Sequence, residues 1–211
     1  LFRLVDIAPE EEGAMEFIKA VKDEVHVSFA HTMADYVTAK KGYDLGADHA
    51  THLYNAMPAF THRAPGVIGA AHDSSHVFVE LITDGVHIHP SVVRTTFDMF
   101  KDRVVLISDS IRATGMPDGE YTLGGQAVNV KGNVATLASD GALAGSVTNL
   151  MDCVRIAVQK MGIPLEDAVA AAAINPARSV GLDDKYGSIK PGKVGNVVLL
   201  DKDLSLKQVI L

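Results

Sequence analysis

The stretch VHVSFAHTMADYVTAKKGYDLGADHATH, residues 25–52, contains a strand, a helix and a second strand in succession. Val25–Ala30 is a mostly apolar run, which predicts a buried strand. Residues 34–45 predict a helix that ends at Gly46, and residues 48–51 predict a short strand. Apolar strands that alternate with helices are typical of a parallel sheet covered by helices, so this stretch indicates an α/β fold.

The same alternation continues on both sides of this stretch. Further strands are expected in three runs: Phe2–Ile7, Val77–Thr83 and Arg103–Ser108. Pro9 and the acidic residues after it predict the first turn of one helix, and Pro90 predicts the start of another. Units of this kind build either a doubly wound sheet or part of a (β/α)₈ barrel, and periodicity alone does not separate the two.

The pattern changes after Asp109. Residues 116–140 are rich in glycine turns and β-forming residues, and they predict a hairpin insertion. Two helices are then expected, at 147–161 and 165–174, and Val197–Leu200 predicts a final strand. The chain therefore carries a β-rich insertion within an otherwise α/β pattern.

Composition excludes several classes of protein. The chain has 211 residues and a formal net charge of −7, which argues against nucleic acid as a general partner. Its only cysteine is Cys153, so no disulfide framework is possible and a reducing, cytoplasmic setting is expected. No apolar run reaches the roughly 18–20 residues of a membrane span. The chain opens inside a predicted strand without Met, so we expect the natural protein to have residues upstream of Leu1.

Ionisable side chains follow four of the predicted strands. His31, His52, Asp84 with His87, and Asp109 come after the strands at 25–30, 48–51, 77–83 and 103–108. Ligands bind at the carboxyl ends of parallel strands, so these groups should meet at one rim. Two imidazoles and a carboxylate suit a site for a divalent cation such as zinc or ferrous iron. The imidazoles would be ligands, and the carboxylate could take a proton from a metal-bound water. A third protein ligand is not obvious in the sequence. The alternative is ordinary rim hydrogen bonding, or helix capping by the aspartates.

A loop beyond His52 carries groups that could bind an anion. The Arg63 guanidinium can hold a phosphate or carboxylate, and Asn55 and the backbone of Ala56 could add hydrogen bonds. The alternative is an arginine paired on the surface. The small-residue segment Gly141–Ser146 could let backbone approach a ligand closely, or it could be a plain connector.

Several motifs together resemble a known family. They are AHTMADY at 30–36, THLYNAM at 51–57, HRAPGVIGAA at 62–71, DGVHIHP at 84–90, LISDSIRATG at 106–115, LAGS at 143–146, NPARSVGL at 175–182 and GSIKPGKVGNVVLLD at 187–201. The combination is similar to the N-acetylglucosamine-6-phosphate deacetylases of the amidohydrolase superfamily, over essentially the whole chain. The last two motifs alone would indicate only the superfamily.

The resemblance implies a role for each matching residue. His31 and His52 would be ligands of one divalent ion, zinc or iron, and Asp109 would be the general base and then the general acid. The sugar phosphate would be held by a larger set of residues: Asn55, Ala56, Arg63, Asp84 and His87, with Leu143, Ala144 and Gly145 lining the sugar pocket. Some phosphate contacts would cross between the subunits of a homodimer.

The resemblance also implies a fold. Residues 1–185 would form the later strands of a (β/α)₈ barrel, N-terminally incomplete, and residues 186–211 would return toward a small β-sandwich. The glutamate that completes the family's metal site, and a histidine that polarises the amide carbonyl, would both fall before Leu1. A two-histidine site without this carboxylate is expected to bind metal weakly.

The implied reaction is metal-dependent hydrolysis of N-acetylglucosamine 6-phosphate to glucosamine 6-phosphate and acetate. Two alternatives remain. The substrate could be another amino-sugar phosphate, such as the galactosamine epimer, or the chain could be a non-catalytic fragment that lacks the metal-binding glutamate. No nucleic-acid or membrane partner is expected.

Overall fold

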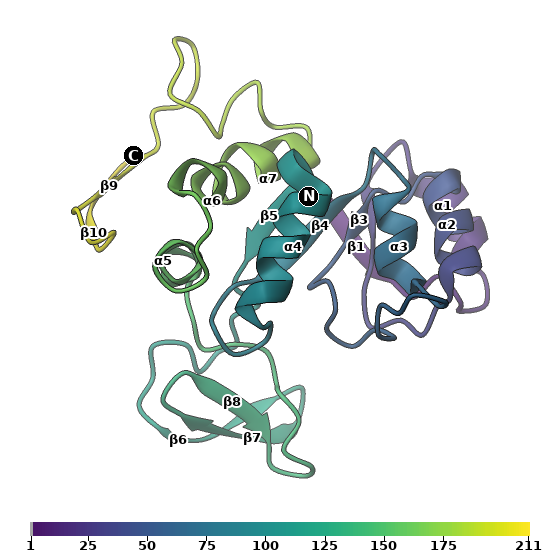
Figure 1. The fold of residues 1–211 in the computed structure, drawn as a ribbon, viewed down its shortest axis with the longest axis horizontal. Helices are drawn as coiled ribbons and strands as arrows, with labels where there is room; N and C mark the ends of the chain where they lie inside the picture. The colour runs from purple at the N-terminus through teal and green to yellow at the C-terminus, as the bar shows by residue number, and fades with distance from the viewer. Residues whose placement is uncertain (1) are drawn as a thin grey trace.

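A five-stranded parallel sheet is the centre of the structure (Figure 1). The computed structural model describes residues 2–211, so Leu1 lies outside the described residues. In spatial order the strands are β1 Leu4–Ile7, β2 His26–Phe29, β3 His49–Ala50, β4 Phe78–Ile82 and β5 Val104–Ile107. Each neighbouring pair is parallel, so the expected α/β fold with a parallel sheet is confirmed.

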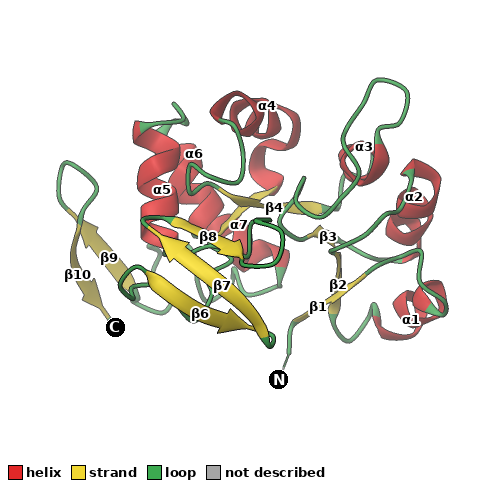
Figure 2. Cartoon of the chain, turned by 90° about the horizontal axis from the view of Figure 1, so that it is seen from below, coloured by secondary structure: helices red, strands yellow, loops and turns green. Residues whose placement is uncertain are grey.

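Helices cover one side of this sheet. After β1 to β4 come, in turn, α1 Ala14–Val21, α2 Tyr36–Leu45, α3 Gly66–His72 and α4 Pro90–Phe100. Figure 2 shows the strands in an arc with these four helices on its outer side. The strands follow one another in chain order without the reversal that a doubly wound sheet makes at its switch point.

The core lies between the strands and the outer helices. Phe29 of β2 and Tyr43 of α2 are buried and stacked, with ring centroids 4.5 Å apart. Gly42 allows this close approach, because a Cβ added there would lie 2.4 Å from Cζ of Phe29. Helix α2 is therefore held against β2 by the fit of a glycine to an aromatic ring.

The later helices extend the outer layer. A short 3₁₀ helix η1, Lys101–Arg103, precedes β5, and α5 Leu150–Gln159, α6 Leu165–Ala172 and α7 Ile174–Ser179 gather beside α4 and β5 (Figure 1). The buried Asn175 donates from Nδ2 to the carbonyl of Val104 at 2.9 Å, which ties α7 to the start of β5. Within residues 2–211 no helix has the length and apolar character needed to cross a membrane.

Two antiparallel sheets lie outside the central one. The predicted hairpins are present as β6 Gly119–Leu123, β7 Gln126–Lys131 and β8 Val134–Leu137. They bury a small core of their own that includes Val128, Val130 and Ala135. The predicted strand at 197–200 is β9 Val197–Leu200, and it pairs with β10 Leu206–Ile210.

Some elements differ from the sequence prediction. The first helix begins at Ala14 rather than at Pro9, because residues 9–13 form turns and Gly13 adopts a left-handed φ of 82°. The sequence analysis did not identify α3, α7 or β10. Helix α3 has no amphipathic pattern in its sequence, because Gly66–Ala71 are all buried and the helix therefore has no polar face.

Candidate functional site

The predicted site residues occupy the same position after their strands. His31, His52, Asp84 and Asp109 are each the second residue after the end of β2, β3, β4 and β5. Because these neighbouring strands are parallel, their carboxyl ends lie along one edge of the sheet. Because each residue follows its strand by the same number of positions, all four ionisable groups lie at one rim of the sheet.

His31 and His52 face each other at this rim. Their Nε2 atoms are 3.1 Å apart, and the rings are nearly perpendicular with an interplanar angle of 89°. Burial lowers the pKa of His52, and the nearby His31 lowers it further, so neutral imidazole is favoured near pH 7. Two ring nitrogens approach this closely when a proton or a cation lies between them, because two lone pairs repel. The pair therefore has the donor type and geometry to hold a metal ion.

Three rim residues share an uncommon backbone conformation. His31, His52 and Asp109 have φ values of 47°, 38° and 49°, in the left-handed region that residues with a Cβ rarely adopt. At His52 the carbonyl accepts hydrogen bonds from the backbone N–H of Asn55 at 2.9 Å and from its side-chain Nδ2 at 3.1 Å. Strained residues of this kind cluster at active sites and ligand clamps.

Asp109 is packed against the small-residue segment 141–146. The backbone N–H of Ser146 donates to the carbonyl of Asp109 at 2.8 Å. Gly145 has a φ of 61°, and a Cβ there would lie 3.0 Å from the Asp109 carbonyl oxygen and 2.6 Å from Ile111. The Asp109 carboxylate is exposed, and its charge raises the pKa of His52, opposing the effect of burial. Asp109 therefore acts electrostatically on the His52 imidazole.

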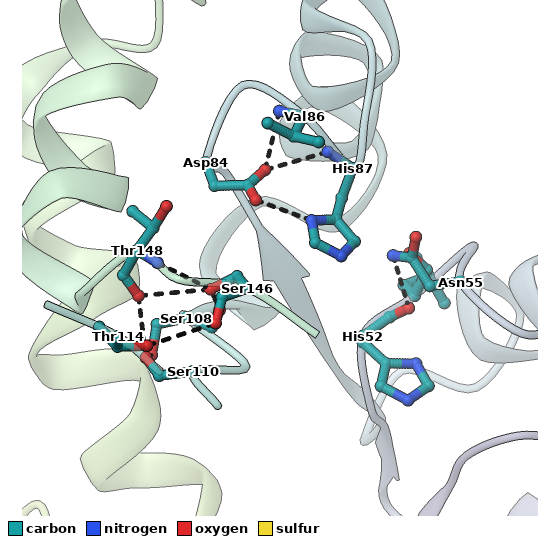
Figure 3. Close-up of polar contacts among 11 residues, drawn as sticks. His52, Asn55, Asp84, Val86, His87, Ser108, Ser110, Thr114, Ser146 and Thr148 are labelled. Carbon is teal, nitrogen blue, oxygen red and sulfur yellow. Dashed lines mark hydrogen bonds and ion pairs between the residues drawn. The ribbon is translucent and has the colours of Figure 1, made fainter. Parts of the chain in front are cut away.

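His87 is held by the buried carboxylate of Asp84. Oδ1 of Asp84 accepts the backbone N–H groups of Val86 and His87 at 2.9 and 3.0 Å, and Oδ2 lies 2.7 Å from Nδ1 of His87. Burial raises the pKa of Asp84, but these hydrogen bonds outweigh it and the pKa is lowered. Figure 3 shows the His87 ring on the side of Asn55 and His52. With Nδ1 engaged, Nε2 is the nitrogen left for a ligand.

A second layer of carboxylates lies on the strands near His52. Thr51 donates from Oγ1 to Oδ1 of Asp6 at 2.8 Å and lies 2.7 Å from Oγ of Ser28. Burial, helped by the charges of Asp6 and Asp109, raises the pKa of Glu80 to about 7. The sequence analysis missed Glu80, although a carboxylate inside the apolar run of β4 was a visible signal.

The predicted anion-binding residues are only partly brought together. Asn55 lies beside His52, but its amide turns back to donate to the His52 carbonyl at 3.1 Å (Figure 3). The same amide nitrogen lies 3.3 Å from the Leu53 carbonyl. Ala56 is exposed with a φ of 50°. Arg63 is exposed in the loop before α3, and it forms no hydrogen bond or ion pair with any residue in 2–211.

A different histidine cluster lies at the opposite, amino ends of β2 and β3. Oδ2 and Oδ1 of Asp48 lie 2.5 and 2.7 Å from Nδ1 of His26 and of His49, and the spacing of these donors is compatible with a metal ion. Hydrogen bonds from the His26 and His49 imidazoles to the Asp48 carboxylate account for these short distances without a metal ion. A cation on Nδ1 of His49 would move the proton to Nε2, which is buried and unpaired among the described residues. We therefore assign the cluster a structural role.

Comparison with known proteins identifies the family. A model described as the amidohydrolase family matches residues 9–211. N-acetylgalactosamine-6-phosphate deacetylase from Escherichia coli O157:H7 is 41% identical over 208 residues, which are 98% of this chain and 55% of that protein. N-acetylglucosamine-6-phosphate deacetylase from Bacillus subtilis (strain 168) is 40% identical over 205 residues, 96% of this chain and 52% of that protein.

A solved structure resembles the whole chain. A mutant N-acetyl-D-glucosamine-6-phosphate deacetylase from Mycobacterium smegmatis, in complex with N-acetyl-D-glucosamine-6-phosphate, has a TM-score of 0.92 and 37% identity over 99% of this chain and 56% of that chain. The chain thus spans about half the length of these relatives. The resemblance predicted from the motifs is confirmed, and the chain belongs to the amidohydrolase family.

Proposed function

We propose that this chain forms the metal-binding and substrate-binding half of an enzyme that hydrolyses the N-acetyl group of an amino-sugar 6-phosphate. The leading candidate substrate is N-acetylglucosamine 6-phosphate. The observation that carries this proposal is the facing pair of His31 and His52 Nε2 atoms, 3.1 Å apart, at the rim that also presents Asp109. The products are the free amine and acetate. The named activities of the relatives supply the substrate class.

The proposed fold of the whole enzyme is a (β/α)₈ barrel. Five consecutive parallel strands in chain order, with helices α1 to α4 outside the arc, support their assignment to the later part of such a barrel. Residues 1–185 would belong to it, with β6 to β8 as an insertion. Residues 186–211, with β9 and β10, would belong to a small β-sandwich. Active sites of such barrels lie at the carboxyl ends of the strands, where the His31–His52 pair lies.

His31 and His52 would hold a divalent ion, zinc or ferrous iron. Neutral imidazole is the right ligand type, and the two Nε2 atoms face each other 3.1 Å apart. Catalytic sites use about three protein ligands, so a further donor is needed. A bound ion would supply Lewis-acid polarisation of water and of the amide carbonyl.

The chain's own residues would then move the proton and hold the sugar. Asp109 would take a proton from the attacking water and return it to the departing amine. His87, with its Nδ1 fixed by Asp84, would donate from Nε2 to the sugar phosphate. Asn55, Ala56 and Arg63 would complete the anion site, and Leu143, Ala144 and Gly145 would line the sugar. Arg63 would reach the phosphate of its own or of the partner's site in a homodimer.

A second substrate has a specific observation in its favour. The relative from Escherichia coli O157:H7 is named for N-acetylgalactosamine 6-phosphate, and it is 41% identical to this chain. The two candidate substrates differ in the configuration of one hydroxyl group. Acetate release from each epimer, measured side by side, distinguishes them.

The test of the proposed function is acetate release with added Zn²⁺ or Fe²⁺, measured on this chain and on a version extended upstream of Leu1. Asp109→Asn should abolish turnover while the bound metal, measured by plasma mass spectrometry, stays nearly unchanged. Arg63→Ala should mainly raise KM. If no acetate is released from either epimer with either ion, the chain is a non-catalytic member of the family.

A further inference from the structure

His31 is an exposed residue between two buried neighbours, Ala30 and Thr32. His31 is exposed and has a left-handed φ of 47°, and its imidazole contacts only the imidazole of His52 among the described polar groups. A strained and exposed residue keeps such a conformation only when its surroundings determine it. The residues that follow His31 must therefore supply the restraint.

Glu10, in the turn that follows the neighbouring strand β1, supplies part of that restraint. Its Oε2 accepts the hydroxyl of Thr32, and its Oε1 accepts the backbone N–H of Met33. The buried Thr32 hydroxyl in turn accepts the backbone N–H of Ala34 at 2.9 Å. One carboxylate thus fixes, directly or through one hydroxyl, the three residues that follow His31.

The position of Glu10 is itself well defined. The strand pairing of β1 and β2 continues past their ends, where the backbone N–H of Ala30 donates to the Ile7 carbonyl at 3.1 Å. A turn follows, closed by a hydrogen bond from the Glu11 N–H to the Ala8 carbonyl at 3.2 Å. This turn places the Glu10 carboxylate level with the segment after β2.

We infer that Glu10 is a positioning residue, which holds the His31 imidazole opposite His52 and thereby sets the affinity of the pair for a divalent cation. This inference rests on the proposed function. Two carboxylate oxygens with two donors on adjacent residues restrain both position and rotation, which a single hydrogen bond does not.

The experiment compares zinc affinity across matched variants, with a chelating dye as competitor. Glu10→Ala should weaken zinc binding by about tenfold or more, the usual effect of losing a group that orients a metal ligand. Glu10→Gln, whose carboxamide oxygen accepts one of the two hydrogen bonds, should recover part of the loss. Thr32→Val should give an intermediate loss. Glu11→Ala removes a neighbouring exposed carboxylate whose side chain forms no hydrogen bond or ion pair among residues 2–211, and it should leave the affinity unchanged.

A second measurement separates this inference from the proposed function. In the metal-free protein, nuclear Overhauser contacts between the His31 and His52 rings should be present in the wild type and in Glu11→Ala, and lost in Glu10→Ala. Unchanged ring contacts and unchanged zinc affinity in Glu10→Ala would overturn the inference. Absence of zinc binding in the wild type, with ring contacts still dependent on Glu10, would overturn the metal site and leave the positioning role intact. Thermal unfolding checks that each variant is folded.

Discussion

His31, His52 and Asp109 each hold a left-handed backbone, with φ of 47°, 38° and 49°. For a residue with a Cβ this conformation costs about 1–2 kcal/mol. Glycine would adopt it freely, but glycine has no imidazole or carboxylate to present. The three side chains proposed to hold the ion and move the proton are therefore all carried on strained backbone.

Asp109→Gly tests this strain. Because the Asp109 side chain is exposed, its removal costs little packing, and glycine relieves the backbone. Allowing for the greater freedom of glycine in the unfolded chain, Asp109→Gly should be more stable than Asp109→Ala by about 0.5–1 kcal/mol in urea unfolding. Both variants should lack turnover. Equal stability of the two would show that the backbone there is not strained.

Glu80 predicts a pH dependence of stability in the metal-free protein. Its pKa is raised from 4.5 to about 7, so the folded state binds more protons than the unfolded state between these values. Stability should therefore fall as the pH rises from about 4.5 to 7. Glu80→Gln removes the titration, so the free energy of unfolding of the wild type should decline relative to the variant over this range. Parallel pH profiles would contradict the raised pKa.

The unit formed by β2, α2 and β3 places both imidazoles. Helix α2 begins after Asp35, whose carboxylate accepts the Thr38 N–H at 2.8 Å, and it ends at Gly46. Its packing on β2 depends on Gly42, because a Cβ there would lie 2.4 Å from Phe29 and 3.4 Å from Ile18. The distance between the ends of β2 and β3 therefore depends on a helix that tolerates no side chain at residue 42.

Gly42→Ala tests the role of this helix. Alanine favours the helix intrinsically, but the clash with the Phe29 ring should make the variant less stable by about 1–3 kcal/mol. Lys41→Ala on the exposed side of the same helix should change the free energy of unfolding by less than about 0.5 kcal/mol. Thermal or urea unfolding measures both. A more stable Gly42→Ala would show that propensity outweighs packing.

The whole molecule should respond to metal as one folding unit. A cation held between His31 and His52 binds the folded state, so zinc at about 100 times its Kd should raise the free energy of unfolding by about 2.7 kcal/mol. The increase should be lost in His52→Ala and retained in His62→Ala, which removes an exposed loop histidine. A chelator should reverse it. The same increase in His52→Ala would place the ion elsewhere, with the His26–Asp48–His49 cluster as the next site to test.

Local pattern predicted most of the elements in their correct order. Apolar runs, proline starts and glycine stops gave the parallel strands, the hairpins and most helices, because each depends on residues close in sequence. It also placed His31, His52, Asp84 and Asp109 at strand ends, since that follows from counting along the chain. Helix α3 was missed because a helix buried all round has no polar face.

Tertiary structure was needed for the geometry of the rim. The 3.1 Å approach of the two imidazoles depends on the pairing of β2 with β3. The Glu10 carboxylate accepts hydrogen bonds from Thr32 and Met33, which lie 22 and 23 positions further along the chain, so no local pattern reveals these contacts. Contacts between distant residues depend on how strands pair and helices pack, and that information is not contained in any one stretch of the chain.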